Sequence, residues 1–247
     1  MAERPILFNT EMVQAIQAGR KTQTRRIIKR QPAFANSELG TPLKRNDGTY
    51  TFRVAPYNHV YEGNYKPPCE PGDIMWVRET WQHVYNFDDG DQLIEGTGRY
   101  VYYADNPMPF DYWVDPDTGE HKEQMPWKPS IHMPKEAARL FLRVKDVRVE
   151  LLRNVFFTDG AAILEVQKEG VDIGETCRAC IEHYGCPCCI NADDDTECVE
   201  LDNPRYVFSK LWDSTIKPAD LPQHGWIANP WVWVITFERC DKPKGWC

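Results

Sequence analysis

The spacing of hydrophobic residues along the chain predicts a mixed structure in which strands outnumber helices. A helix is predicted after Asn9-Thr10, because capping residues precede apolar positions at helical spacing and Gly19 follows as a stop. Two more helices are expected, at 158–169 and from Pro204 onward. The predicted strands are 6–8, 21–28, 74–81, 99–104, 138–152 and 231–237, with a short extended segment at 130–133 and a hairpin near 49–54.

These elements, taken in order, favour the α+β class, in the form of a small β-barrel, closed or half open, with flanking helices. The chain has 247 residues, of which 42% are hydrophobic, and this fits one large domain spanning 1–247. Stretches rich in proline, glycine and polar residues predict insertions at about 31–70 and 106–129. A third insertion, at about 172–202, is rich in cysteine.

The formal net charge of -8 disfavours binding of phosphate backbones by the protein as a whole. Segment 19–30 is the exception, because it contains no acidic residue. Its cations are Arg20, Lys21, Arg25, Arg26, Lys29 and Arg30. This basic cluster is expected to attract phosphates and to steer RNA into a cleft. The competing interpretation is a solvated basic strand that pairs with surface carboxylates.

The sequence predicts neither an export signal nor a membrane span. The N-terminal MAERPILFNT lacks the apolar run of a signal peptide, and no stretch reaches the roughly 18 apolar residues of a spanning helix. We therefore expect a cytoplasmic protein without membrane partners. In that compartment its cysteines are thiols or metal ligands rather than disulfides.

Four ordered motifs resemble those of ASCH domains, in the larger form common in bacteriophage and prophage proteins. They are AGRKTQTRR (18–26), PGDIMWVRETW (71–81), WKPSIHMP (127–134) and NPWVWVI (229–235). The resemblance covers most of the chain. It implies a PUA-like β-barrel whose cleft holds RNA or a modified nucleobase.

The first motif also suggests catalysis. A lysine whose pKa is lowered by burial and by neighbouring arginines can act as a base toward a Thr hydroxyl. Some small ASCH proteins are amidohydrolases that remove an acyl group from acetylated cytidine with a Lys, a Thr and a Glu. The resemblance carries these roles to Lys21, Thr24 and Glu169, with Glu165, one helical turn earlier, as the competing carboxylate.

The spacing of Lys21 and Thr24 opposes this catalytic interpretation. Residues three apart on a regular strand face opposite sides, so Lys21 meets Thr24 only if the turn at Gly19 or a bulge re-aims it. The alternative is that Thr24 is an ordinary strand residue and Lys21 a phosphate contact.

Further binding residues are expected in the second and third motifs. Trp76 either walls a base pocket or packs in the core. Adjacent strand residues face opposite ways, so Arg78 or Glu79 points into the cleft, unless both belong to cross-strand ion pairs. His132 is either a base contact or a structural histidine.

The cysteine-rich insertion at about 172–202, the cysteine-rich lobe, predicts a structural zinc site with four thiolate ligands. The candidates are Cys177, Cys180, Cys186 and Cys189, with Cys188 or Cys198 as substitutes and His183 as a further donor. An iron–sulfur cluster is the rival. The lobe is also acidic, so it would avoid phosphate and is a candidate surface for a protein partner.

These observations leave several functions open. The first is binding of RNA or a modified nucleobase. The second is an amidohydrolase acting on N4-acetylcytidine-type nucleosides. A ribonuclease and a phage-encoded protein that contacts a host partner are the other two.

Overall fold

A computed structural model describes the greater part of the chain. The described residues are 2–32, 40–54, 59–86, 88, 94, 96–107, 109, 113–115, 118–156, 161–171 and 204–246. The chain divides into two compact units, each with its own core. Unit 1 comprises 1–18, 73–143 and 239–247, and unit 2 comprises 19–72 and 144–238.

Unit 1 is built on a parallel strand pair, β1 (Glu3–Leu7) with β6 (Ile74–Arg78), and β6 also pairs antiparallel with the start of β11 (Phe141–Leu151). Helix α1 (Thr10–Gln17) follows β1, and the Asn9 side chain caps it by accepting a bond from the Met12 N–H at 2.9 Å. Two short antiparallel ribbons are β7 (Trp81–Val84) with β8 (Arg99–Tyr102), and β9 (Trp113–Val114) with β10 (His121–Lys122). The 3-10 turns η1 (Ser130–His132) and η2 (Lys135–Ala137) complete the unit.

Unit 2 contains β2 (Gln23–Ile27), most of β11, and β12 (Trp231–Cys240) down to residue 238, in the order β11-β12-β2. A separate antiparallel sheet consists of β3 (Gly40–Lys44), β4 (Tyr50–Val54) and β5 (His59–Tyr65). The described helices are α2 (Ala161–Lys168), α5 (Pro204–Ser214) and α6 (Leu221–His224), with the 3-10 turns η3 (Leu152–Phe156) and η4 (Pro218–Asp220).

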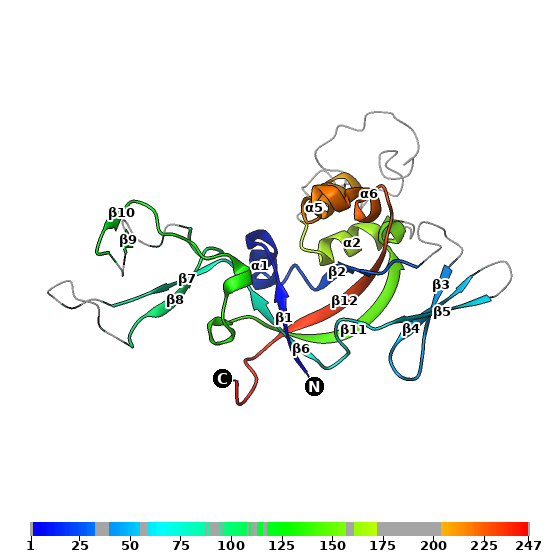
Figure 1. Cartoon of the computed structure of the whole chain (residues 1–247), viewed down its shortest axis with the longest axis horizontal. Coiled ribbons are helices and arrows are strands. Elements are labelled where there is room, and N and C mark those ends of the chain that lie inside the picture. The colour runs from blue at the N-terminus through cyan, green and yellow to red at the C-terminus, as the bar shows by residue number, and fades with distance from the viewer. Residues whose placement is uncertain are drawn as a thin grey trace. The chain divides into compact units, whose positions relative to one another are not determined.

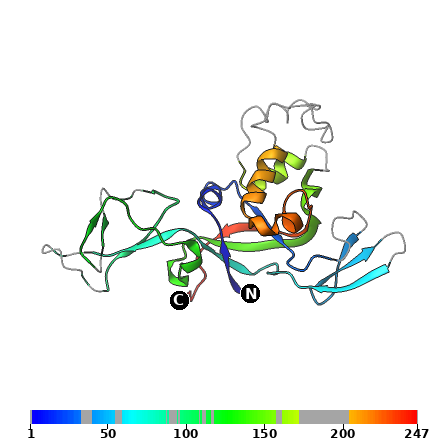
Figure 2. The ribbon, with the colours of Figure 1, turned by 45° about the horizontal axis from the view of Figure 1, so that its top comes forward.

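The core of unit 2 lies between its helices and β12. Figures 1 and 2 both show α2 and α5 on one face of β12 and β2. Apolar side chains from the helices and from alternate β12 positions fill this layer: Leu152, Val166, Val171, Phe208, Trp212, Trp226, Val232 and Val234. On the same strand, Trp231 and Trp233 pack edge-on against Phe52 and Tyr50 of β4. The packing of α2 in this apolar layer holds the end of the helix on the β2 side of the sheet.

The predicted α+β class is confirmed, because sheets predominate and helices are few. The described strands form open sheets, and no closed barrel is present among them. Predicted strand 74–81 is two strands, β6 and β7, interrupted at Glu79 and Thr80. The segment predicted as extended at 130–133 is the 3-10 turn η1, which His132 closes by donating its N–H to the Pro129 carbonyl.

Two of the predicted insertions contain more regular structure than their composition suggested. The hairpin expected near 49–54 is the middle strand of the β3-β4-β5 sheet, and the loop-like 106–129 holds the β9–β10 ribbon. The cysteine-rich lobe 172–202 lies outside the described residues. No helix in the described part is both long and apolar enough to span a membrane.

Candidate functional site

The candidate site is centred on Glu169, in the turn that ends α2. The helix stops there because Gly170 takes a left-handed conformation, with φ 88°, that favours glycine. The Glu169 N–H donates to the Val166 carbonyl at 3.1 Å, and this bond between residues three apart tightens the last turn of α2. The Glu169 carboxylate is buried in unit 2, with 5% of the residue exposed.

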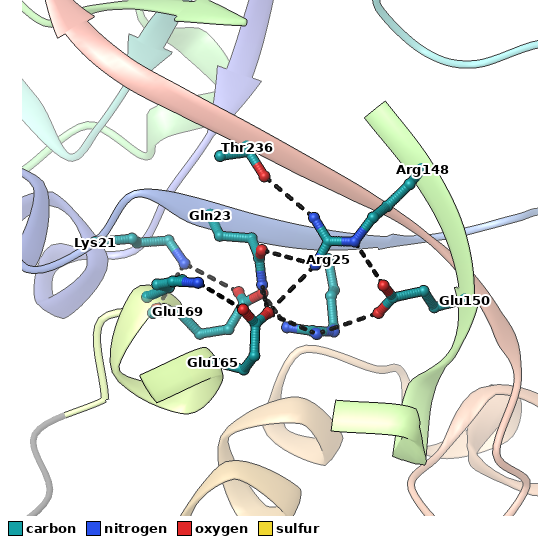
Figure 3. Close-up of polar contacts among 9 residues, drawn as sticks. Lys21, Gln23, Arg25, Arg148, Glu150, Glu165, Glu169 and Thr236 are labelled. Atoms are coloured by element: carbon teal, nitrogen blue, oxygen red, sulfur yellow. Dashed lines mark hydrogen bonds and ion pairs between the residues drawn. The ribbon is translucent and has the colours of Figure 1, made fainter. Parts of the chain in front are cut away.

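Lys21 is one of two buried cations that contact this carboxylate. Its Nζ donates to the backbone carbonyl of Glu169 at 2.6 Å and lies 3.3 Å from Oε2 (Figure 3). A backbone bond from the Thr22 N–H to the Lys168 carbonyl, 2.9 Å long, ties the approach to β2 to the end of α2. The structure therefore brings together two of the three predicted catalytic residues, and it selects Glu169 over Glu165 as the partner of Lys21.

The other carboxylate oxygen of Glu169 is bound by β2. Arg25 Nη1 lies 2.6 Å from Oε1, and Gln23 Nε2 donates to the same oxygen at 3.3 Å. Gln23 and Arg25 share one face of β2, as residues two apart on a strand must. The two oxygens of Glu169 thus have different partners.

A second group of charges surrounds Arg25 at its far end (Figure 3). Arg25 Nη2 lies 3.6 Å from Glu150 Oε2 on β11 and 3.7 Å from Glu165 Oε2 on α2. Arg148, also on β11, donates from Nε to Glu150 at 2.5 Å and from Nη2 to Glu165 at 3.2 Å. Arg148 also bonds Gln23 Oε1 at 3.1 Å and Thr236 Oγ1 at 3.3 Å.

Burial and charge shift the pKa values of the central pair in one direction. Burial lowers the pKa of Lys21, the charge of Glu169 partly offsets this, and Arg26 and Arg25 lower it further. Burial by itself would raise the pKa of Glu169, but Lys21, Arg25 and Gln23 outweigh it and hold that pKa below its usual value. A lysine with a lowered pKa therefore lies next to a carboxylate whose pKa is also lowered.

Thr24 is buried on β2, opposite Ile235 of β12. Strand alternation directs its side chain to the face opposite Gln23 and Arg25. Lys21, Gln23 and Arg25 all contact Glu169, so the Lys21 side chain is on their side of the strand. The predicted geometric objection to a Lys21–Thr24 pair is thus supported.

The basic cluster of 19–30 separates into inner and outer cations. Lys21 and Arg25 are buried, with side chains 0% and 1% exposed, and they form ion pairs inside the protein. Arg26 is partly buried, and burial lowers its pKa. Arg20, Lys29 and Arg30 remain exposed, and Arg20 also donates to the Gly170 carbonyl at 3.3 Å. Of the six cations in 19–30, only Arg20, Lys29 and Arg30, the outer cations, are exposed as a contact with phosphate requires.

The remaining predicted binding residues belong to unit 1. Trp76 is in the core there, 6.0 Å from the Trp246 ring. Arg78 donates to the backbone carbonyls of Met133 and Ile131, and its guanidinium lies 5.5 Å from the Trp76 ring. His132 is exposed in the η1 turn.

Glu79, also in unit 1, is 1% exposed and accepts two bonds from Arg139, each 2.9 Å long. Glu79 thus belongs to a buried ion pair rather than to an open binding site, but the pair is not cross-strand, because neither Glu79 nor Arg139 lies in a strand.

Sequence reasoning missed three members of the site: Gln23, Arg148 and Glu150. Arg148 and Glu150 alternate on β11 with the buried residues Val147 and Val149. This alternation of charge with apolar residues was the available signal, since it marks one polar face on a strand next to the core.

The predicted zinc ligands Cys177, Cys180, Cys186, Cys188, Cys189 and Cys198 all lie outside the described residues. Within the described residues, no cluster of His, Cys, Asp and Glu is arranged to hold a metal ion. The zinc site stays a prediction.

Comparison with known proteins adds no relative. The chain matches no protein-family model, no curated protein and no solved structure.

Proposed function

We propose that this protein is a PUA-like, ASCH-type amidohydrolase that removes an acyl group from a modified pyrimidine nucleoside, with Lys21 and Glu169 as its acid–base pair. The observation that carries the proposal is the buried contact of Lys21 Nζ with Glu169 Oε2 at 3.3 Å. A purely electrostatic phosphate site has no need of a buried carboxylate next to its lysine, whereas general acid–base catalysis does.

The proposed reaction uses Lys21 as the base and Glu169 as its charged partner, and the lowered pKa values of both groups support these roles. Neutral Lys21 accepts a proton from the attacking hydroxyl, whose oxygen adds to the acyl carbonyl carbon. Ionised Glu169 stabilises the resulting ammonium. The C–N bond then breaks, and the Lys21 ammonium returns its proton to the leaving nitrogen. Water and amide are consumed, and a carboxylic acid and the free exocyclic amine are formed.

The attacking hydroxyl comes from water or from Thr24. A water route needs one addition step, whereas a Thr24 route passes through an ester that water then hydrolyses. The Thr24→Val variant separates the two routes, because valine keeps the shape and removes the hydroxyl. Since Thr24 faces away from the Glu169 side of β2, we expect this variant to keep most of the turnover.

The test is incubation of the purified protein with N4-acetylcytidine, followed by chromatography of the products. We expect cytidine and acetate from the native protein, and a loss of about 1000-fold in turnover for Lys21→Met. Lys168→Met is the matched control, because Lys168 is a neighbouring but exposed lysine that pairs with Glu165. No turnover by the native protein, or equal losses in both variants, would contradict the proposal.

Binding of RNA or a modified base is a second candidate, favoured by the outer cations Arg20, Lys29 and Arg30, which flank β2 in the sequence and are exposed. Replacing all three by Gln should weaken binding of a single-stranded RNA at low salt by at least about 10-fold. Lys21→Met, which changes a buried residue, should leave that binding unchanged. RNA affinity that is insensitive to the triple change would exclude this role.

A further inference from the structure

Arg25 is unusual among the cations of the site, because it is buried and yet touches three carboxylates. Its side chain is 1% exposed. Nη1 contacts Glu169, while Nη2 lies between Glu150 and Glu165. The ring of Phe208 on α5 lies 5.8 Å from the guanidinium carbon. The 2.6 Å bond of Nη1 to Glu169 therefore sets the orientation of the guanidinium, whereas the contacts of Nη2 with Glu150 and Glu165 are longer ion pairs without a hydrogen bond.

This orientation determines what the Glu169 carboxylate can do. Oε1 has two partners from β2, Arg25 at 2.6 Å and Gln23 at 3.3 Å. Oε2 is the oxygen directed at Lys21. A buried carboxylate that is held at one oxygen by a fixed guanidinium cannot rotate freely, so its other oxygen keeps its direction.

We propose that Arg25 is a positioning residue, which binds Oε1 of Glu169 and thereby keeps Oε2 directed at Lys21. The catalytic importance of this positioning rests on the proposed function. The position of the Glu169 carboxylate is tested by an experiment that does not measure turnover. Lysine is a poor substitute for Arg25, because an ammonium lacks the planar fork that contacts Glu169 with one nitrogen and the outer carboxylates with the other.

The experiment follows the titration of the Lys21 amine and the Glu169 carboxyl by NMR in the full-length protein. Arg25→Gln removes a positive charge that lowers both pKa values, so both should rise, by roughly one pH unit. Arg148→Gln is the matched control: it removes the same charge from the same cluster, yet Arg148 bonds Glu150 and Glu165 rather than Glu169. Its effect on both groups should be less than half as large.

A conservative variant separates charge from geometry. Arg25→Lys keeps the charge and should restore the Lys21 titration to within about 0.3 pH units of the native value. If the protein turns over N4-acetylcytidine, kcat in this variant should still fall about 100-fold, because Glu169 is no longer held. In Arg25→Gln, the acid limb of the pH–kcat/KM profile should move upward with the Lys21 pKa.

The outcomes distinguish the two proposals. If no protein form shows turnover but the titrations shift as described, the amidohydrolase fails and the positioning of Glu169 by Arg25 stands. Equal shifts in Arg25→Gln and Arg148→Gln would overturn the positioning role. The same conclusion follows if Arg25→Gln does not fold and Arg25→Lys has native titrations and native kcat.

Discussion

Among the described residues, each unit buries one glutamate beside an arginine, and the two glutamates differ in the rest of their surroundings. Glu79 in unit 1 has Arg139 as its partner, with both bonds 2.9 Å long, and Arg139 also pairs with Asp105. Burial raises the pKa of Glu79, and Arg139 only partly offsets this. Glu169 in unit 2 has Lys21, Arg25 and Gln23, and its pKa is lowered.

The comparison shows that the kind of cation decides what a buried carboxylate can do. The guanidinium of Arg139 does not release a proton at any ordinary pH, so its pair with Glu79 can only be structural. A buried lysine, by contrast, can lose its proton, and burial lowers the pKa of Lys21. A cation that can release its proton therefore lies beside Glu169 but not beside Glu79.

The largest expected effect is on stability in unit 1. Arg139→Met leaves Glu79 buried without its cation, and we expect the free energy of unfolding to fall by about 3–5 kcal/mol. Urea denaturation followed by circular dichroism measures it. A loss below about 1 kcal/mol would show that Glu79 needs no compensating charge. The pair of Glu79 with Arg139 would then not be the structural ion pair that the comparison assumes.

Lys21→Met should cost less stability than the change in unit 1. Glu169 keeps Arg25 at 2.6 Å, and the main loss is the Lys21 bond to the Glu169 backbone carbonyl. We expect a decrease of about 1–3 kcal/mol, measured in the same urea experiment. A cost as large as that of Arg139→Met would mean that Lys21 is the principal structural partner of Glu169.

The two glutamates should give the pH dependence of stability opposite signs. Glu169 has a folded pKa below its usual value of 4.5, so its contribution is present above that pH and is lost as the pH falls through the folded pKa. Glu79 has a folded pKa above 4.5, so its contribution is present below that pH and is lost as the pH rises through the folded pKa.

Unfolding free energies of Glu169→Gln and Glu79→Gln, measured against native protein from pH 3 to 7, test this assignment. The native advantage over Glu169→Gln should shrink toward low pH, and the advantage over Glu79→Gln should shrink toward high pH. Parallel curves for the two variants would contradict the assigned directions.

The smallest expected effect serves as the reference for exposed charges. Lys145 and Glu238 form a pair 3.3 Å long in which both side chains are about half exposed, at 54% and 49%. Solvent screens such a pair, so Lys145→Gln should change the free energy of unfolding by less than about 1 kcal/mol. A larger change in thermal or urea denaturation would show that burial is not what distinguishes the Glu79 and Glu169 pairs.

Local sequence signals predicted the elements that depend on local physics. The Asn9 cap, the stop of α2 at Gly170 and the start of α5 at Pro204 were all predicted, because capping and glycine or proline backbone preferences act within a few residues. Strand 74–81 was predicted too long, since its apolar pattern continues past Glu79. The interruption there accompanies the pairing of Glu79 with Arg139, which is 60 residues away in the chain.

The candidate site was partly predictable for the same reason. The resemblance of the motifs singled out Lys21, Thr24 and Glu169, but the side of β2 on which Lys21 lies was open. Arg25 was expected to contact phosphate or RNA together with the rest of the basic cluster, and nothing in 19–30 predicted its burial. Its burial follows from packing between β11, α2 and α5, which are remote in sequence.

Amino-acid order alone was enough to define the α+β class, the approximate positions of the main strands and of three helices, and the basic character of the first motif, because each depends on neighbouring residues. The meeting of Lys21 with Glu169, 148 positions further along, required the approach to β2 to lie against the last turn of α2. Burial lowers the pKa of Lys21, and the neighbouring cations and Gln23 hold the pKa of Glu169 below its usual value. Burial depends on every element that excludes water from a point, so it belongs to the assembled tertiary structure and not to any segment of the chain.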